Sequence, residues 1–329
     1  MANPAPQRPK LLRTSERSTF KRCRWKYYLE FVELRKPVTE VPPLRFGTLI
    51  HSALAAYYKP GVKRGPHPAE TFADLYRADV EEAAAFGFRV EEDETWVDAG
   101  ELGVAMLTNY IDYYDSDDQW EVVVTEMPFQ VPVKHDPPFA YVGVLDGVWR
   151  DAGTGRLWIP DHKTTAAIQT KYLALDEQAS SYYTFGVEAL HRRGMLPRKE
   201  EIEGILFNFL RKAKPDERPT NAAGQSLNKD GSISAKQPAP YFERKMVHRG
   251  VNERNATYNR VQLEVDDILA VQMGSIDEAY KNAGQFTCVG CWAFDICELH
   301  EIGADYREFM EATTKPWDPY EPHEIMEGR

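Results

Sequence analysis

The spacing of apolar residues changes along the chain and separates helical segments from strands. Apolar residues recur with the helical period in three N-terminal segments, at 15–34, 44–58 and 67–115. From Val122 onward the period falls to about two, which predicts three strands, at 122–133, 140–149 and 157–163. The glycine-containing segment 152–155 predicts the turn between the last two strands, and a helix over 171–192 precedes a short strand over 205–210.

This order of elements predicts an α/β fold in which helices flank a small mixed central sheet. Residues 212–240 are rich in Pro, Asn, Gly, Ser and Lys without an apolar period, so we predict a flexible loop there. A further helix is expected over 263–283. We therefore expect one domain over 15–311, with a flexible tail at 1–14 and a peripheral acidic tail at 312–329.

The composition is that of a globular enzyme, with 43% hydrophobic and 12% aromatic residues. No apolar run approaches the roughly 18 residues of a membrane helix, and the first residues lack the apolar stretch of a signal peptide. We therefore expect a cytoplasmic protein, in whose reducing surroundings cysteines bind metals or take part in catalysis rather than form disulfides. The absence of a G-x-x-x-x-G-K-[ST] motif argues against a P-loop motor.

Charge is distributed unevenly along the chain. The net charge of −11 argues against a protein that binds nucleic acid over its whole surface. However, residues 1–36 contain ten Lys or Arg against three acids, and residues 211–250 contain nine against four. Each basic segment is either a solvated face or a track for a phosphate backbone, and the sequence leaves both interpretations open.

Two acids and a lysine in the strand region indicate hydrolytic chemistry. Asp161 and Lys163 are two residues apart on a predicted strand, so their side chains share a face. If the hairpin turns tightly about Gly153 and Thr154, Asp146 lies opposite Asp161, with Cβ atoms about 5 Å apart. Two such carboxylates repel each other, and a hard divalent cation such as Mg²⁺ or Mn²⁺ would remove the repulsion.

Two predicted helices carry polar residues that could serve the same site. His51 lies on the helix at 44–58, and Gly47 one turn earlier would let that helix approach the sheet. Gln178 and Tyr182 are spaced i, i+4 and therefore share a face of the helix that follows the Asp-x-Lys strand. Taken singly, each of these residues is better explained by an ordinary interfacial position.

In chain order, these residues form four short motifs: Phe46-Gly47-Thr-Leu-Ile-His51, Gly143-Val-Leu-Asp146, Asp161-His-Lys163 and Gln178-x-x-x-Tyr182. Together they resemble the motifs of the PD-(D/E)XK nuclease superfamily, and the histidine ahead of the sheet is similar to that of its RecB-like branch. The resemblance spans about residues 15–300. It implies a restriction-endonuclease-like core that hydrolyses phosphodiester bonds in DNA.

The resemblance also implies a role for each motif residue. The Mg²⁺ or Mn²⁺ ion that it implies would be bound by four groups: His51, Asp146, Asp161 and the main-chain carbonyl of His162. Lys163 would position or help to deprotonate the attacking water and would offset charge on phosphorus. Gln178 and Tyr182 would orient the lysine or contact a phosphate group. Glu126, in the first strand, is expected to be a surface glutamate rather than a neighbour of the metal ligands.

All four cysteines fit a single site, because one precedes the motifs and three follow them: Cys23, Cys288, Cys291 and Cys297. Structural zinc sites usually combine two close pairs, whereas only one close pair exists here. This favours a [4Fe–4S] cluster on four thiolates, with zinc, for which His300 is another ligand, as the alternative. AddB-type nucleases and CRISPR-associated nucleases of the fourth family, which the chain resembles, carry such a cluster. It would join the N- and C-terminal helical segments.

We therefore predict a metal-dependent DNA exonuclease that acts in recombination or DNA end processing. Two alternatives remain open: an endonuclease that uses the same residues, and a DNA-binding or assembly module without turnover. A structural zinc protein whose acids are incidental is a third. Because the chain lacks a motor motif, a separate helicase or single-strand annealing protein is a candidate partner.

Overall fold

A computed structural model of the chain describes residues 10–38, 42–85, 93–136, 138–274 and 279–320. Residues 1–9 and 321–329 of the predicted tails lie outside this described part. None of the described helices is long and apolar enough to cross a membrane.

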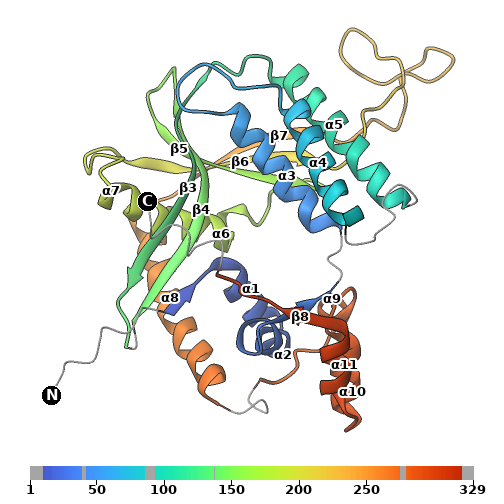
Figure 1. Cartoon of the computed structure of the whole chain (residues 1–329). Helices are drawn as coiled ribbons and strands as arrows, with labels where there is room; N and C mark the ends of the chain where they lie inside the picture. Colours follow the sequence, from blue (N-terminus) through green and yellow to red (C-terminus); the bar gives the residue numbers. More distant parts are fainter. Residues whose placement is uncertain (1–9, 39–41, 86–92, 137, 275–278, 321–329) are drawn as a thin grey trace.

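Helices and strands follow one another along the whole described chain (Figure 1). The N-terminal elements are β1 (Lys10–Leu12), α1 (Thr14–Arg22), α2 (Arg24–Tyr27), the π-helix η1 (Tyr28–Val32), β2 (Arg35–Pro37), α3 (Pro42–Tyr57), α4 (Pro68–Ala85) and α5 (Glu94–Tyr114). The central elements are β3 (Trp120–Val133), β4 (Phe139–Asp151), β5 (Leu157–Thr165), η3 (Leu173–Leu175), α6 (Glu177–Ser181), the π-helix η4 (Tyr182–Gly186), α7 (Val187–Arg192) and β6 (Ile202–Arg211). The C-terminal elements are β7 (Phe242–His248), α8 (Val251–Met273), α9 (Gln285–Cys288), α10 (Phe294–Glu301), α11 (Tyr306–Thr313) and β8 (Thr314–Pro316).

Within the described residues, six strands form one mixed sheet in the order β1-β4-β5-β6-β7, and β3 also pairs with β4. Because β3 pairs with β4 along its whole length, β1 and β5 must share the other edge of β4. β1 pairs at Phe139–Tyr141, whereas β5 pairs only at Trp149 and Arg150. The edge of β4 over 142–148 therefore has no strand partner in the described structure on that side.

A hydrophobic core covers each face of the sheet. On one face, Leu145 and Ile159 pack with residues of α6, η4, α7 and α8. On the other face, Trp149 and Trp158 pack with residues of α3, α4 and α5, which Figure 1 shows grouped on one side of the sheet. Ile159 and Trp158 enter different cores because successive residues of a strand point to opposite faces.

A further apolar cluster joins segments from the two ends of the chain. Trp25 and Leu29 pack against Ala293, Ile296 and Met310, so that α10 and α11 lie close to α2 (Figure 1). β2 pairs antiparallel with β8 and strengthens this connection. The N-terminal and C-terminal helices thus form a unit of their own beside the sheet.

The predicted α/β fold with a mixed central sheet flanked by helices is confirmed. The helix predicted over 15–34 is interrupted at Cys23, whose backbone is extended (φ −161°, ψ 115°). α8 begins at Val251, well before the predicted start. The prediction missed this first part because residues 251–262 are largely polar and show little apolar period. β1 and β7 are absent from the prediction because β1 is short and β7 is mostly charged.

The predicted tails and loop contain more structure than expected. Lys10–Leu12, within the predicted N-terminal tail, pair with β4. Thr314–Pro316, within the predicted C-terminal tail, form β8, and the Tyr320 hydroxyl donates to the buried Glu16. Residues 212–240 are cross-linked by isolated β-bridges and side-chain hydrogen bonds. Most of these contacts lie in short irregular turns or join distant segments, which a local apolar pattern does not reveal.

Candidate active site

The site begins at the open part of the β4 edge. β4 and β5 pair with the register of the predicted hairpin, but only at two positions next to the turn. Further along, Pro160 has no N–H for the ladder. The Oδ2 of Asp146 instead accepts the main-chain N–H of His162 at 2.8 Å. The Asp146 carboxylate therefore occupies the gap between the two strands, rather than facing Asp161 across a continuous ladder.

Three potential metal ligands meet at this gap. The Nδ1 of His51 lies 3.4 Å from Oδ1 of Asp146, and the ligand atoms of His51, Glu126 and Asp146 all lie within 4.8 Å of one another. α3 supplies the histidine and comes close to the sheet at Gly47, where an added Cβ would lie 3.4 Å from Oγ1 of Thr164. Side chains of two strands and one helix thus converge on one point.

Glu126 is the site residue that the sequence did not predict. Glu126 is exposed, as expected, but the β3–β4 register places it across from Asp146, so it lies among the candidate ligands and not apart from them. Its φ of +43° is unusual for a residue with a Cβ and costs on the order of 1–3 kcal/mol. A register argument for the β3–β4 hairpin, like the one applied to β4 and β5, would have found it.

β5 and α6 hold the other predicted residues in a single chain of contacts. The Lys163 Nζ lies 2.9 Å from Oδ2 of Asp161 and donates to Oε1 of Gln178 at 2.7 Å. The Gln178 Nε2 donates in turn to the hydroxyl of Tyr182 at 2.8 Å. Because an ammonium group only donates, Lys163 determines which way the Gln178 amide faces.

His51 and Asp146 change each other's pKa. Burial alone would lower the pKa of His51, but the Asp146 carboxylate outweighs burial and raises the pKa to about 9. Burial alone would raise the pKa of Asp146, but His51 outweighs it and lowers the pKa to about 2. At neutral pH the imidazole therefore holds a proton that a metal ion would have to displace.

Two further carboxylates bind protons more tightly than usual. Burial raises the pKa of Asp161 to about 6, although Lys163 opposes the shift. Removal from water raises the pKa of Glu126 to about 7, and Asp146 adds to the shift. The Oδ2 of Asp161 is buried, and the Lys163 ammonium lies 2.9 Å from it. Carboxylates crowded in this way are suited to a divalent cation, which removes their mutual repulsion.

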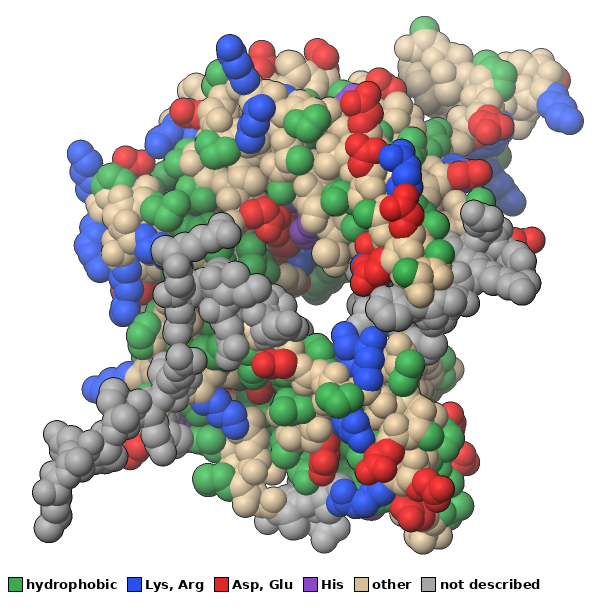
Figure 2. Space-filling view, viewed as in Figure 1, with side chains coloured by type: hydrophobic (Ala, Val, Ile, Leu, Met, Phe, Trp, Pro, Cys, Tyr) green, Lys and Arg blue, Asp and Glu red, His purple; other side chains and the backbone are tan. Residues whose placement is uncertain are grey.

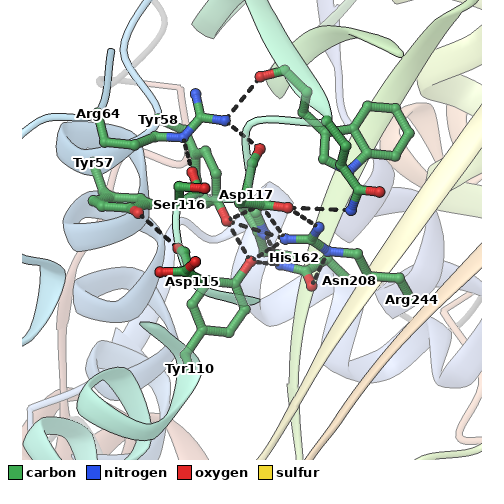
Figure 3. Close-up of polar contacts among 12 residues, drawn as sticks. Tyr57, Tyr58, Arg64, Tyr110, Asp115, Ser116, Asp117, His162, Asn208 and Arg244 are labelled. Carbon is green, nitrogen blue, oxygen red and sulfur yellow. Dashed lines mark hydrogen bonds and ion pairs between the residues drawn. The ribbon is translucent and has the colours of Figure 1, made fainter. Parts of the chain in front are cut away.

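The His162 side chain lies on the face of β5 opposite to Asp161 and Lys163. Its ring packs at 6.1 Å from the ring of Tyr58 and at 5.8 Å from that of Trp149. Burial lowers the pKa of His162 to about 3, so the ring is neutral. Figure 3 shows it within a network of polar side chains. The metal-binding role of the His162 carbonyl stays a prediction.

Two side chains of the site are partly exposed to solvent. Figure 2 shows acidic, basic and histidine side chains gathered in a hollow between the sheet and the C-terminal helices. The side chains of His51 and Lys163 are 31% and 19% exposed, whereas that of Asp161 is 2% exposed. A substrate that approaches the site would therefore meet the histidine and the lysine before Asp161.

The cysteines converge at the apolar cluster beside the sheet, and all are free thiols: Cys23, Cys288, Cys291 and Cys297. Burial raises the pKa of Cys297 to about 12, and the neighbouring Cys23 and Cys291 contribute next. Burial also raises the pKa of Cys291. The thiols are thus close enough to interact electrostatically, which suits joint binding of a metal centre as thiolates.

The family model of the PD-(D/E)XK nuclease superfamily matches residues 14–298. The chain belongs to the PD-(D/E)XK nuclease superfamily. The match includes every motif residue named above and all four cysteines, and membership indicates phosphodiester hydrolysis. No curated protein matches the sequence. Among solved structures, the chain is similar to one named "Putative exonuclease" from Eubacterium rectale, with 13% identity, 87% coverage of each chain and a TM-score of 0.44.

Proposed function

We propose that the protein is a Mg²⁺- or Mn²⁺-dependent DNA nuclease that acts as an exonuclease in recombination or DNA end processing. The observation that carries the proposal is the meeting of His51, Glu126 and Asp146 beside the buried Asp161–Lys163 pair. Membership of the PD-(D/E)XK superfamily supports phosphodiester hydrolysis. The dependence on Mg²⁺ or Mn²⁺ and the choice of DNA as substrate go beyond that membership and are part of the proposal.

The cation would be held by four side chains: His51, Glu126, Asp146 and Asp161. Their oxygen-rich composition suits Mg²⁺ or Mn²⁺, and the Lys163 ammonium, 2.9 Å from the buried Oδ2 of Asp161, favours the ionised form of that carboxylate. The His162 carbonyl is a further candidate ligand. When bound, the cation would stabilise the charge that develops on the scissile phosphate.

We assign Lys163 the role of a fixed cation and not of a base. Burial would lower its pKa, but Asp161 outweighs burial and raises it, so the ammonium keeps its protons at neutral pH. Two of its three N–H groups are directed at Asp161 and Gln178, which leaves one for a water molecule or a phosphate oxygen. Gln178 and Tyr182 would hold the ammonium in that orientation.

Of the two basic segments, the N-terminal one contributes more to the fold than to a DNA track. Arg17 is buried and donates to Glu264 at 2.5 Å. Lys21 pairs with Glu177 and with the same Glu264. These contacts join α1 to α6 and α8, so the charges of Arg17 and Lys21 are largely neutralised within the protein.

The second basic segment is better placed to contact DNA. Lys212 directly follows β6, and its main-chain N–H donates to Thr165 at the end of β5 at 2.7 Å. Lys229 and Lys236 are exposed on the loop between β6 and β7, which projects from the body of the protein in Figure 1. We propose that these lysines contact the phosphate backbone on its way to the site.

We further propose that the four cysteines hold a [4Fe–4S] cluster. The alternative zinc ligand, His300, packs its ring 4.4 Å from that of Trp25, and its Nδ1 lies 3.0 Å from the Lys281 Nζ, so that a metal could reach it only through Nε2. Lys26 and Lys281 lie near the thiols and lower the pKa of Cys291 and Cys297 respectively, against the larger effect of burial. Both lysines would offset the negative charge of four thiolates.

The test is digestion of linear and covalently closed circular DNA with Mg²⁺ or Mn²⁺ by protein purified without oxygen. Asp161→Asn keeps the shape of the side chain but removes its charge, and we expect it to slow cleavage about 100-fold or more. Asp74→Asn, an equal change at a side chain that is 73% exposed on α4, is the matched control and should cleave like wild type.

Each result of the digestion selects one function. Loss of linear DNA alone, suppressed by Asp161→Asn, supports the exonuclease. Cutting of the circles would make the protein an endonuclease on the same residues. No cleavage by protein with an intact metal centre would favour a DNA-binding or assembly module. A pull-down from the native host that recovers neither a helicase nor a single-strand annealing protein would count against such a partner.

A further inference from the structure

Asn208 belongs to a buried polar network that includes His162, Arg244 and Asp117 (Figure 3). It is 0% exposed and is the neighbour of His162 in the β5–β6 register. Its Nδ2 donates to Nδ1 of His162 at 2.7 Å and to the hydroxyl of Tyr110 at 2.9 Å. Its Oδ1 accepts from Nε of Arg244 at 3.2 Å. Every polar atom of this side chain is thus used.

The orientation of the Asn208 amide follows from its partners. Arg244 is held by both oxygens of Asp117, at 2.7 and 2.6 Å, and the Asp117 side chain is 1% exposed. A guanidinium has no acceptor, so the amide oxygen must face Arg244 and the NH₂ group must face His162. The Nδ1 of His162 is therefore the acceptor, and the neutral ring carries its proton on Nε2.

The position of His162 matters because β5 lacks support from β4 at this point. The main-chain N–H of His162 holds the Asp146 carboxylate at 2.8 Å, and the neighbouring residues are Asp161 and Lys163. Its ring also meets the ring of His51 edge-to-face, with centroids 5.8 Å apart. A shift of His162 would therefore move the candidate ligands Asp146, Asp161 and His51 together.

We propose that Asn208, oriented by Arg244 and Asp117, is a positioning residue that holds His162 in the Nε2–H tautomer and thereby sets the geometry of the cation site. None of these three residues belongs to the motifs quoted above. The inference rests on the proposed function, because it assigns Asn208 to the cation site of the nuclease. Groups that orient metal ligands typically change metal affinity about 10- to 100-fold when they are removed.

The experiment combines two measurements on the full chain purified without oxygen. ¹⁵N spectra of protein labelled at histidine report the tautomer of His162, with His162→Asn used to identify its signals. Titration with Mn²⁺, followed by the electron paramagnetic resonance of the free ion, reports cation affinity without the need for activity. Asn208→Asp keeps the side-chain shape but replaces the donor by an acceptor, and Asn208→Ala removes both groups.

Leu206→Ala is the matched control. Leu206 is 0% exposed, lies on the same strand and face as Asn208 and packs in the same core, but it has no polar contact with His162. The Leu206→Ala variant should be less stable than wild type but should keep the wild-type tautomer of His162 and the wild-type affinity for Mn²⁺. A loss of affinity in this variant equal to that in Asn208→Ala would indicate general loosening and overturn the proposal.

We expect wild type to show the Nε2–H tautomer, Asn208→Asp to shift the proton to Nδ1, and both Asn208 variants to bind Mn²⁺ about 10- to 100-fold more weakly. An unchanged tautomer together with unchanged affinity in Asn208→Asp would overturn the proposal. Mn²⁺ binding by wild type without DNA cleavage would overturn only the nuclease activity. Absence of Mn²⁺ binding by wild type would overturn both.

Discussion

At the scale of single residues, protons and a metal ion compete for the same side chains. His51, Asp161 and Glu126 have raised pKa values, of about 9, 6 and 7. Asp146 differs, because its lowered pKa of about 2 leaves it ionised. A cation needs the neutral imidazole and the ionised carboxylates, so its binding must release protons.

This competition predicts that Mn²⁺ affinity rises with pH. Each raised pKa belongs to a group that binds a proton in the free site, so fewer protons need to be displaced as the pH rises from about 5 to about 9. Calorimetry in two buffers with different ionisation enthalpies would count the protons released at each pH. Glu126→Gln should abolish the contribution near pH 7. Affinity that stays constant or falls with pH would contradict the prediction.

At the scale of elements, two helix glycines lie where the helix packs against another element, and they differ in how well they would tolerate a methyl group. An added Cβ at Gly103 of α5 would lie 2.0 Å from the ring of Phe72 on α4, which is 0% exposed. At Gly47 of α3, the nearest atom would be Oγ1 of Thr164 at 3.4 Å, an ordinary contact. The first glycine is required by packing, whereas the second leaves room for a methyl group.

The two glycines predict opposite effects of the same substitution. Alanine in a helix is favoured over glycine by about 1 kcal/mol, so Gly47→Ala should be neutral or stabilising. In Gly103→Ala, overpacking that costs about 1–3 kcal/mol should outweigh this gain and lower the free energy of unfolding. Urea denaturation of both variants is the measurement.

A second variant separates packing from other causes. In Phe72→Leu the side chain that faces Gly103 is smaller. Combined with Gly103→Ala, this substitution should recover part of the stability that Gly103→Ala loses. Equal stabilisation by Gly103→Ala and Gly47→Ala would show that α4 and α5 do not pack as closely as the structure has them.

At the scale of the whole molecule, the proposed cluster would connect the two ends of the chain. Cys23 lies where the N-terminal helix is interrupted, and the other three thiols begin about 265 residues later, in α9, in α10 and between them. By chain-entropy reasoning, a link that closes such a loop is worth about 5–6 kcal/mol. The apolar contacts of Trp25 with Ala293 and Ile296 hold the same segments together with or without the cluster.

Removal of one thiol should therefore loosen both ends without unfolding the sheet. Cys23→Ser is expected to lose bound iron, to lower the melting temperature and to expose residues 279–320 to proteolysis. Ile296→Val, a small change in the same apolar cluster, should retain iron and resist the protease. Metal analysis and limited proteolysis followed by mass spectrometry are the measurements. Full iron content in Cys23→Ser would contradict the assignment of this cysteine, and zinc in place of iron would favour a structural zinc site.

Local patterns in the sequence determined the strands, most of the helices and the order of the motifs. The alternation of apolar residues is sufficient to place β3, β4 and β5, because burial of one face imposes a period of two wherever the strand pairs. The same period places Asp161 and Lys163 on one face. These features depend only on neighbouring residues, so they can be read without knowledge of the fold.

Tertiary structure alone decided how these elements meet. The break in the β4–β5 ladder, the approach of Glu126 to Asp146 and the contact of Asn208 with His162 depend on pairing between strands and on the positions of helices distant in the chain. β1 and β7 gain stability from the strands beside them and show little pattern of their own. The sequence by itself therefore determined which residues are available for the site, whereas long-range packing decided which of them meet at the metal position.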